Sequence, residues 1–195
     1  MKRILVVGLC VVAAVSAHAS QRDSQKTAGQ PASVETETET EIPILGRLIG
    51  LWDVSMVSRN LDGSWPDETL HRLWRWYPIL NGQAIQDDWI RLDAATDGSS
   101  HPSVRVTGTN IRIFNPETEE WSMAWIDTLS RKLATFTATN VEDTVVMTGR
   151  KNQGRLVRIT FSNITAEAFE WTQDWTSDDG ETWFPVARMQ CRRLK

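Results

Sequence analysis

The sequence predicts an all-β protein, a single antiparallel up-and-down β-barrel of about 8–10 strands with at most a short N-terminal helix. From residue 42 onward, most segments alternate apolar and polar residues or are rich in β-branched and aromatic residues, which is typical of strands. The breaks between these segments contain Asp, Asn, Gly and Pro, which favour tight turns. The sequence has no long segment with the periodicity of an amphipathic helix. A barrel is predicted because closing the sheet removes its exposed edges.

The sequence preceding the barrel divides into two parts. Residues 1–19 are expected to be a signal peptide, because the basic "MKR" is followed by an apolar run from Ile4 to Ala17 and an A-x-A cleavage pattern. The alternative is an uncleaved first strand. Residues 20–41, which contain "ETETETE", are expected to form a flexible acidic linker, and residues 42–195 the barrel domain. We therefore expect an exported protein, periplasmic or secreted, without a stable membrane anchor once the signal is removed.

The elements of the barrel domain follow in order along the chain. "IPILGRLIG" at 42–50 is expected to form one turn of helix before the first strand. "NLDG" at 60–63 places Asp-Gly between the first two strands, Pro116 begins a later turn, and "KNQG" at 151–154 ends in a turn glycine. The predicted strands span residues 50–58, 68–77, 83–92, 104–114, 120–127, 132–140, 143–149, 154–162, 167–176 and 182–193.

The stretch "TSDDGETW" at 176–183 matches the Asp-box pattern of sialidase-type β-propellers, with Thr176 in the place of the usual serine. A propeller needs several blades of four strands, and this chain contains a single box. The stretch is therefore predicted to be a hairpin between the last two strands. Asp178, Asp179 and Gly180 would shape its turn, and Trp183 would anchor the final strand.

With this architecture, the "GLW" motif from Gly50 to Trp52 resembles the G-x-W signature of lipocalins and other calycin barrels. "LNGQAIQDDW" at 80–89, "FNPETEEWSMAWID" at 114–127 and the Asp-Gly-x-Thr-Trp hairpin resemble uncharacterised exported bacterial barrels of that type. The resemblance implies that Trp52 closes the barrel base and stacks on an arginine of the last strand, either Arg192 or Arg193. It also implies a cavity for a small apolar or amphipathic molecule, and it provides no catalytic residues to carry over.

The chain contains ten Trp residues and a single Tyr, so the faces on which these Trp residues lie matter for function. Strand alternation predicts an inward-facing set with apolar walls and a few polar groups, as in binding pockets. The alternative is a solid barrel in which the Trp residues are core. If the barrel has a cavity, the expected ligand-binding residues are Trp74, Trp76, Trp89, Arg112, Trp121, Trp125, Asp127, Trp171 and Gln173.

Charge and cysteine usage exclude several classes of function. Removing the signal peptide leaves 19 basic against 25 acidic residues, a net charge of −6, which argues against nucleic-acid binding. Cys191 would then be the single cysteine of the mature chain, and we expect it to be a small buried hydrophobic residue. The sequence has no catalytic motif and no cluster of metal ligands with usable spacing, so no cofactor and no metal are expected.

These observations predict a binding protein for a small molecule of unknown identity, apolar or aromatic in character. The first alternative is a barrel enzyme of isomerase or cyclase type, with Asp87 and Asp127 as general acid and base across the cavity. The second is a non-enzymatic scaffold or export accessory protein, whose partner would bind the barrel rim or the acidic linker. The sequence leaves the oligomeric state open.

Overall fold

A computed structural model describes residues 43–93, 103–151 and 154–195. The signal peptide expected at 1–19 and the linker expected at 20–41 lie outside the described residues. Within the described part there are two short 3-10 helices, η1 (Ile44–Leu48) and η2 (Leu80–Gly82). Neither of them is long and apolar enough to cross a membrane.

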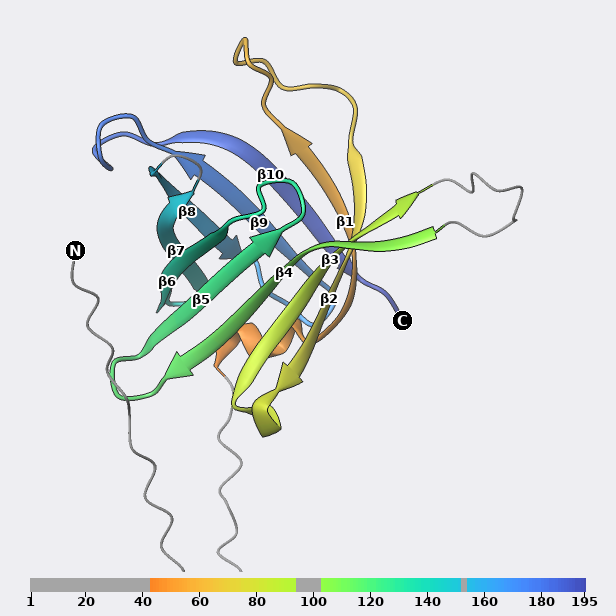
Figure 1. Cartoon of the computed structure of the whole chain (residues 1–195), viewed down its shortest axis with the longest axis vertical. Helices are drawn as coiled ribbons and strands as arrows, with labels where there is room; N and C mark the ends of the chain where they lie inside the picture. The colour runs from red at the N-terminus through yellow and green to blue at the C-terminus, as the bar shows by residue number, and fades with distance from the viewer. Residues whose placement is uncertain (1–42, 94–102, 152–153) are drawn as a thin grey trace, which may run out of the picture. The chain divides into compact units, whose positions relative to one another are not determined.

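The strands of the described chain form one closed antiparallel barrel, in which each strand pairs with its neighbours in sequence and β1 pairs with β10 (Figure 1). This confirms the predicted fold, and each predicted strand is present within two residues of its predicted ends. The strands are β1 (Gly50–Ser58), β2 (Leu70–Ile79), β3 (Ala84–Asp93), β4 (Ser103–Asn115), β5 (Glu120–Asp127), β6 (Leu133–Val141), β7 (Thr144–Lys151), β8 (Arg155–Ser162), β9 (Ala168–Trp175) and β10 (Phe184–Arg193).

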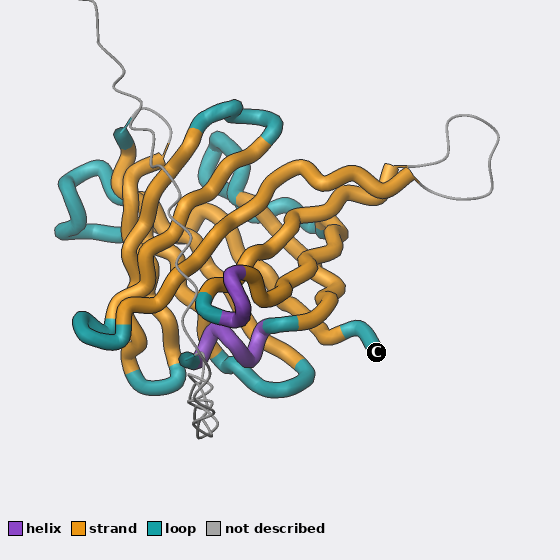
Figure 2. The backbone as a smooth tube through the Cα atoms, turned by 60° about the horizontal axis from the view of Figure 1, so that its bottom comes forward, coloured by secondary structure: helices purple, strands orange, loops and turns teal. Residues whose placement is uncertain are grey.

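The helical turn predicted from "IPILGRLIG" is η1, which lies at one end of the barrel (Figure 2). The interior at this end is filled with packed side chains. Leu45 and Leu48 of η1 are fully buried there. They pack into one cluster with aromatic residues from the strand ends, such as Trp52 and Phe169, whose rings meet edge to face at 4.7 Å. Burial of such large apolar side chains is the main stabilising contribution to a barrel of this size.

Arg193 fastens this closed end. Its guanidinium carbon lies 4.2 Å from the centre of the Trp52 ring, and the guanidinium donates hydrogen bonds to the carbonyls of Ile49 at 2.7 Å and Arg47 at 2.6 Å, and also to Ala166. Trp52 in turn donates from Nε1 to the carbonyl of Leu48 at 2.7 Å. Of the two arginines that the resemblance offered, Arg193 is therefore the partner of Trp52.

Arg192 is not the partner, because neighbouring residues of a strand face opposite sides of the sheet. Arg192 pairs with Asp53 in the β1–β10 register and is exposed on the outer face. Gly50 is needed where β1 begins for two reasons. Its φ of +139° is unfavourable for other residues, and a Cβ there would overlap the Arg193 guanidinium.

The hairpin at 176–183 connects β9 to β10, as predicted, and Asp178 is its centre. The Asp178 carboxylate accepts hydrogen bonds from the Thr176 hydroxyl at 2.6 Å, the Thr182 amide at 2.9 Å and the Thr182 hydroxyl. These bonds, with that from Thr176 the strongest, hold the pKa of Asp178 well below its usual value. Asp179 and Gly180 adopt positive φ angles of 59° and 108°.

The other predicted anchors also have partners. Trp183 lies under the guanidinium of Arg158, whose carbon is 4.5 Å from the Trp183 ring centre. Arg158 also forms an ion pair with Asp174 at 2.8 Å, so the side chain is held between two partners. Cys191 is buried as expected, and burial raises the pKa of its thiol far above the usual value.

Replacing Arg193 by Met should destabilise the protein by about 2 kcal/mol, because the variant loses the cation–π contact and leaves backbone carbonyls of the base with fewer donors. Urea unfolding followed by Trp fluorescence measures the change. The matched control is Arg192→Met, which should shift stability by less than about 0.5 kcal/mol. Equal losses in the two variants would contradict this account of the base.

Asp178→Ala should lower the urea midpoint at neutral pH, because the carboxylate organises the turn. Ligand affinity should be unchanged, because the contacts of this carboxylate are confined to the turn. A lowered folded-state pKa stabilises the protein above the unfolded pKa, and the effect is lost as the pH falls. The gap between wild type and variant should therefore narrow as the pH falls below 3.8, the usual value for the group. A gap that stays constant on acidification would contradict the assignment. The control is Asp179→Asn, which removes an exposed carboxylate and keeps a residue type that tolerates the positive φ of this position.

Candidate functional site

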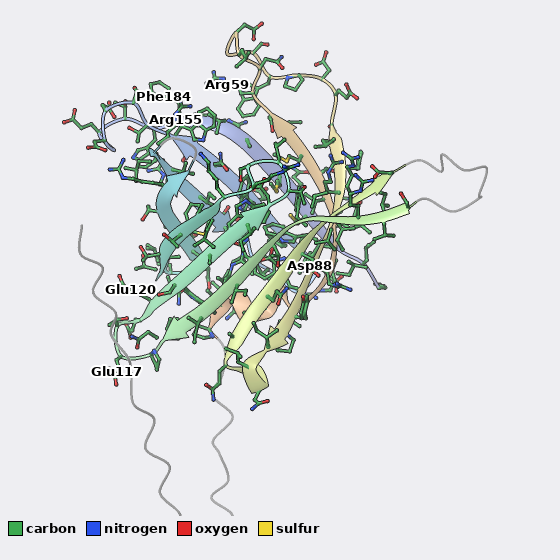
Figure 3. The ribbon with its side chains drawn as sticks, in the orientation of Figure 1. Arg59, Asp88, Glu117, Glu120, Arg155 and Phe184 are labelled. Carbon is green, nitrogen blue, oxygen red and sulfur yellow. The ribbon has the colours of Figure 1, made fainter. Side chains whose placement is uncertain are left out.

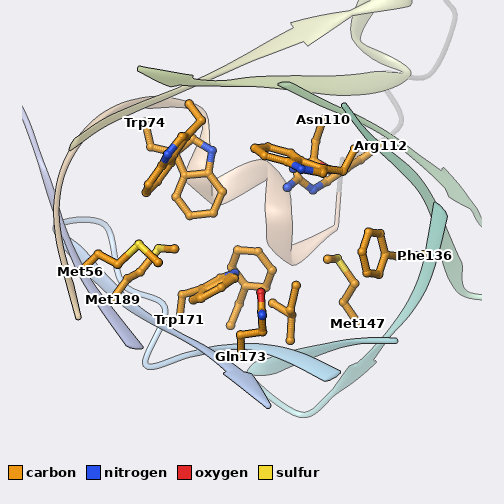
Figure 4. Close-up of a pocket in the computed structure, with 13 residues that line it drawn as sticks. Met56, Trp74, Asn110, Arg112, Phe136, Met147, Trp171, Gln173 and Met189 are labelled. Atoms are coloured by element: carbon orange, nitrogen blue, oxygen red, sulfur yellow. The ribbon is translucent and has the colours of Figure 1, made fainter. Parts of the chain in front are cut away.

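The interior of the barrel beyond the packed base contains a partly open cavity of about 180 Å³. All ten described strands contribute to its lining, with Trp74, Asn110 and Arg112 on one wall and Trp171 and Gln173 opposite (Figure 4). The full lining consists of Met56, Trp74, Trp89, Asn110, Arg112, Trp125, Phe136, Met147, Ile159, Phe161, Trp171, Gln173 and Met189. Most of these side chains are aromatic, thioether or aliphatic.

The walls combine rigid rings with flexible thioethers. Trp74 and Trp89 face each other across the β2–β3 pair and meet edge to face at 5.4 Å. Met56, Met147 and Met189 contribute unbranched, polarisable side chains that can adjust to the shape of a ligand. A cavity wall of this kind suits flat, apolar ring systems.

Two glycines create the space for aromatic rings on these walls. Gly108 of β4 lies against the Trp125 ring, and Gly149 of β7 lies against the ring of Phe136. A Cβ at either glycine would overlap the ring that it faces, so neither position has space for a larger residue without displacement of the wall. These glycines therefore determine where Trp125 and Phe136 lie.

A buried ion pair between Asp87 of β3 and Arg112 of β4 lies at the cavity floor. The two side chains are 0% and 1% exposed. Trp74 donates from Nε1 to Asp87 Oδ1 at 2.6 Å, and the Arg112 guanidinium lies 4.1 Å from the ring centre of Trp76. Burial lowers the pKa of Arg112 to about 9, so the side chain remains protonated at neutral pH.

The register of β2, β3 and β4 explains why these groups meet. Asp87 lies opposite Trp76 of β2 on one side and opposite Asn110 of β4 on the other. Asn110 and Arg112 are two residues apart on one strand, so they share the inward face. Asn110 directs its amide nitrogen at Asp87 Oδ1, 3.5 Å away.

Six of the nine residues predicted to bind a ligand line the cavity, and three do not. Trp76 and Trp121 face inward as predicted, but each is 1% exposed within the packed base. Alternation specifies the face of a side chain but not its depth along the barrel axis, which explains the difference. The six are Trp74, Trp89, Arg112, Trp125, Trp171 and Gln173.

Asp127 is the third residue that does not line the cavity, because it organises the turn after β5. It accepts hydrogen bonds from the Ser130 amide at 2.6 Å, the Ser130 hydroxyl at 2.7 Å, the Leu129 amide at 2.9 Å and Trp125 Nε1 at 2.8 Å. Partial burial raises the pKa of Asp127, but these bonds outweigh it and lower the pKa below its usual value. The pair of carboxylates considered as general acid and base therefore does not face one cavity, since Asp87 is held by Arg112 and Trp74.

The sequence interpretation missed seven lining residues. Asn110 had a detectable signal, since it lies two residues before Arg112 on a strand that alternates. The others lie on predicted strands, at inward positions that carry no aromatic pair or charge to distinguish them. The seven are Met56, Asn110, Phe136, Met147, Ile159, Phe161 and Met189.

The barrel end opposite η1 carries arginines stacked on Trp rings. Arg188 and Arg59 lie 4.6 and 5.7 Å from the ring centre of Trp65, and Arg155 lies 4.3 Å from that of Trp175. Arg59 and Arg155 lie at one end of the barrel, whereas Glu117 and Glu120 lie at the other (Figure 3). Within the described residues, no group of three or more His, Cys, Asp or Glu side chains is placed to hold a metal ion.

Comparison with solved structures finds chains that are similar to this one. The S-type phycobiliprotein lyase CPES from Guillardia theta matches with a TM-score of 0.49 and 9% sequence identity, over 78% of this chain and 91% of that chain. No protein-family model matches the sequence. No curated protein matches it either.

Asp87→Ala should destabilise the barrel by about 3–5 kcal/mol, because Arg112 would remain buried without its counterion. The double variant Asp87→Leu with Arg112→Met replaces the pair with apolar side chains of similar size, and it should be much closer to wild type. Urea unfolding of the single and double variants provides the comparison. A double variant as unstable as the single one would show that the pair itself, rather than the unpaired charge, determines the loss.

Proposed function

We propose that this protein binds a small apolar or aromatic molecule in its barrel cavity and performs no chemistry on it. The observation that carries the proposal is the partly open cavity lined by Trp, Phe and Met side chains with three polar groups. Binding sites for small molecules have this composition, with apolar walls for affinity and a few polar groups for orientation.

The size of the cavity limits the ligand. An apolar cavity of about 150 Å³ in another protein is large enough to hold benzene. The cavity of about 180 Å³ therefore suits one ring or two fused rings. Because the cavity is partly open, a larger ligand would extend through its mouth.

The side-chain types of the lining favour binding over catalysis. The thirteen described lining residues are apolar, amide or guanidinium side chains. Such groups hold and orient a ligand, whereas a nucleophile or a general base at neutral pH requires other side chains. The expected signal peptide supports placing this binding activity outside the cytoplasm, and export is part of the proposal.

The proposal predicts that naphthalene, a bicyclic apolar probe, quenches or shifts the Trp emission of the purified protein in a saturable manner. Ile159→Trp, which fills the cavity, should weaken the binding measured by calorimetry about tenfold or more. Thr160→Trp adds the same side chain to the neighbouring position on β8, whose side chain points to the outer face, and should bind as wild type does.

Saturable binding that is the same in a folded Ile159→Trp variant would place the ligand elsewhere and contradict the proposal. Native mass spectrometry of protein purified from its own host is the complementary experiment. It should show a retained ligand mass on a chain that begins at Ser20. A chain that retains residues 1–19 would contradict export by signal cleavage.

A further inference from the structure

Two buried polar atoms of cavity-lining residues have no hydrogen-bond partner among the described residues and take no part in the Asp87–Arg112 ion pair: Nε of Arg112 and Oδ1 of Asn110. Both residues line the cavity, and they are 1% and 5% exposed. Buried polar atoms in native proteins are almost always hydrogen-bonded, so an unpaired donor and an unpaired acceptor beside one cavity need an explanation. A bound molecule in the cavity would provide the missing partners.

The orientation of the Asn110 amide follows from its neighbour. The Asp87 carboxylate is ionised by its pairing with Arg112 and can only accept hydrogen bonds. The NH₂ group of Asn110 must therefore be the end that faces Asp87, where the separation is 3.5 Å. The amide oxygen is then the end without a partner. The buried ion pair acts as the group that positions the amide.

The two unpaired atoms require opposite partners. Arg112 Nε–H needs an acceptor, and Asn110 Oδ1 needs a donor. Because the two residues lie two positions apart on β4, about 7 Å along the strand, their side-chain ends can reach one edge of a single ligand. A carboxamide or lactam carries an N–H beside a C=O along one edge, and this edge would satisfy both atoms.

Charge indicates that the ligand is neutral. Arg112 is the one charged side chain among the thirteen described lining residues, and Asp87 already balances it. A ligand carboxylate would approach Asp87 and the Asn110 oxygen, both of which repel it. A ligand cation would lack a free counterion in a largely apolar cavity.

Resting on the proposed function, we infer that the ligand is a neutral planar ring compound whose amide or lactam edge pairs with Asn110 and Arg112. The C=O of that edge accepts from Arg112 Nε, and the N–H donates to Asn110 Oδ1. The ring then lies among Trp74, Trp89 and Trp171. The apolar walls limit the size of the ligand ring. Asn110 and Arg112 of β4 determine which edge of the ligand faces the cavity floor.

The test compares bicyclic probes of nearly equal size on the wild-type protein: 2-quinolone with a lactam edge, quinoline with an acceptor alone, and naphthalene with neither. Calorimetry should show 2-quinolone binding about tenfold more tightly than naphthalene, with quinoline between them. For charge, 2-naphthamide should bind more tightly than 2-naphthoate. Naphthalene binding as tightly as 2-quinolone, or 2-naphthoate binding more tightly than 2-naphthamide, would overturn the inference and leave the proposed function standing.

Asn110→Leu separates the contributions on the protein side. The variant should still bind naphthalene but lose the preference for 2-quinolone. Its affinity for 2-quinolone should fall close to its affinity for naphthalene. Asn140→Leu makes the same substitution at an exposed position of β6 and should keep the preference. A folded Asn110→Leu variant that still prefers 2-quinolone would overturn the inference, and the wild-type probe series decides the matter if that variant does not fold. If no bicyclic probe binds the wild-type protein, the proposed function fails as well.

Discussion

The buried ion pair between Asp87 and Arg112 is the interaction on which the interior of this barrel depends. It joins β3 to β4, receives the indole N–H of Trp74 from β2, and lies against the ring of Trp76. Taking both charges out of water is unfavourable unless their remaining hydrogen-bonding groups are also satisfied. The pair therefore brings polar groups to the barrel interior and fixes their positions. A wholly apolar core would provide no directional contact there.

The same pair marks the boundary between two ways of filling a barrel. Toward η1, Trp, Phe and Leu side chains fill the interior, and the Arg193–Trp52 contact closes the end. Away from η1, Met side chains and rings held against Gly108 and Gly149 leave a space. A packed base gives stability, and this stability permits an incompletely filled opposite half. The packed end of the barrel at η1 therefore stabilises the fold, and the opposite half provides the cavity.

The architecture of this protein could be predicted from its sequence because every strand carries its own signal. Alternating side chains, with Asp-Gly and Asn-Pro at the turns, were sufficient for ten strands and for the hairpin around Asp178. The inward faces of Trp74, Trp89 and Trp171 followed from the same alternation. Choosing between Arg192 and Arg193 required the register with β1, which a single strand does not encode.

The parts of the site that could not be predicted from the sequence are those that depend on contacts between strands. Alternation places Trp76 and Trp121 inward but does not give their depth, because depth depends on strand tilt around the closed barrel. The carboxylates show the same limit: Asp87 is paired by a residue from β4, and Asp127 by the turn that follows it. The role of Asn110 emerges when its amide is seen between Asp87 and the cavity.

The closure of the base by Arg193 has a consequence for the order of folding. Arg193 binds the carbonyl of Ile49, which is 144 residues earlier in the chain, and β1 finds its second neighbour in β10. Contacts between such distant segments form slowly, since the ends of a long loop must first meet. Until then the sheet is an open ribbon with β1 and β10 as free edges, and the floor of the cavity has no surrounding wall. The period before closure is therefore when the chain is most vulnerable to pairing with another chain.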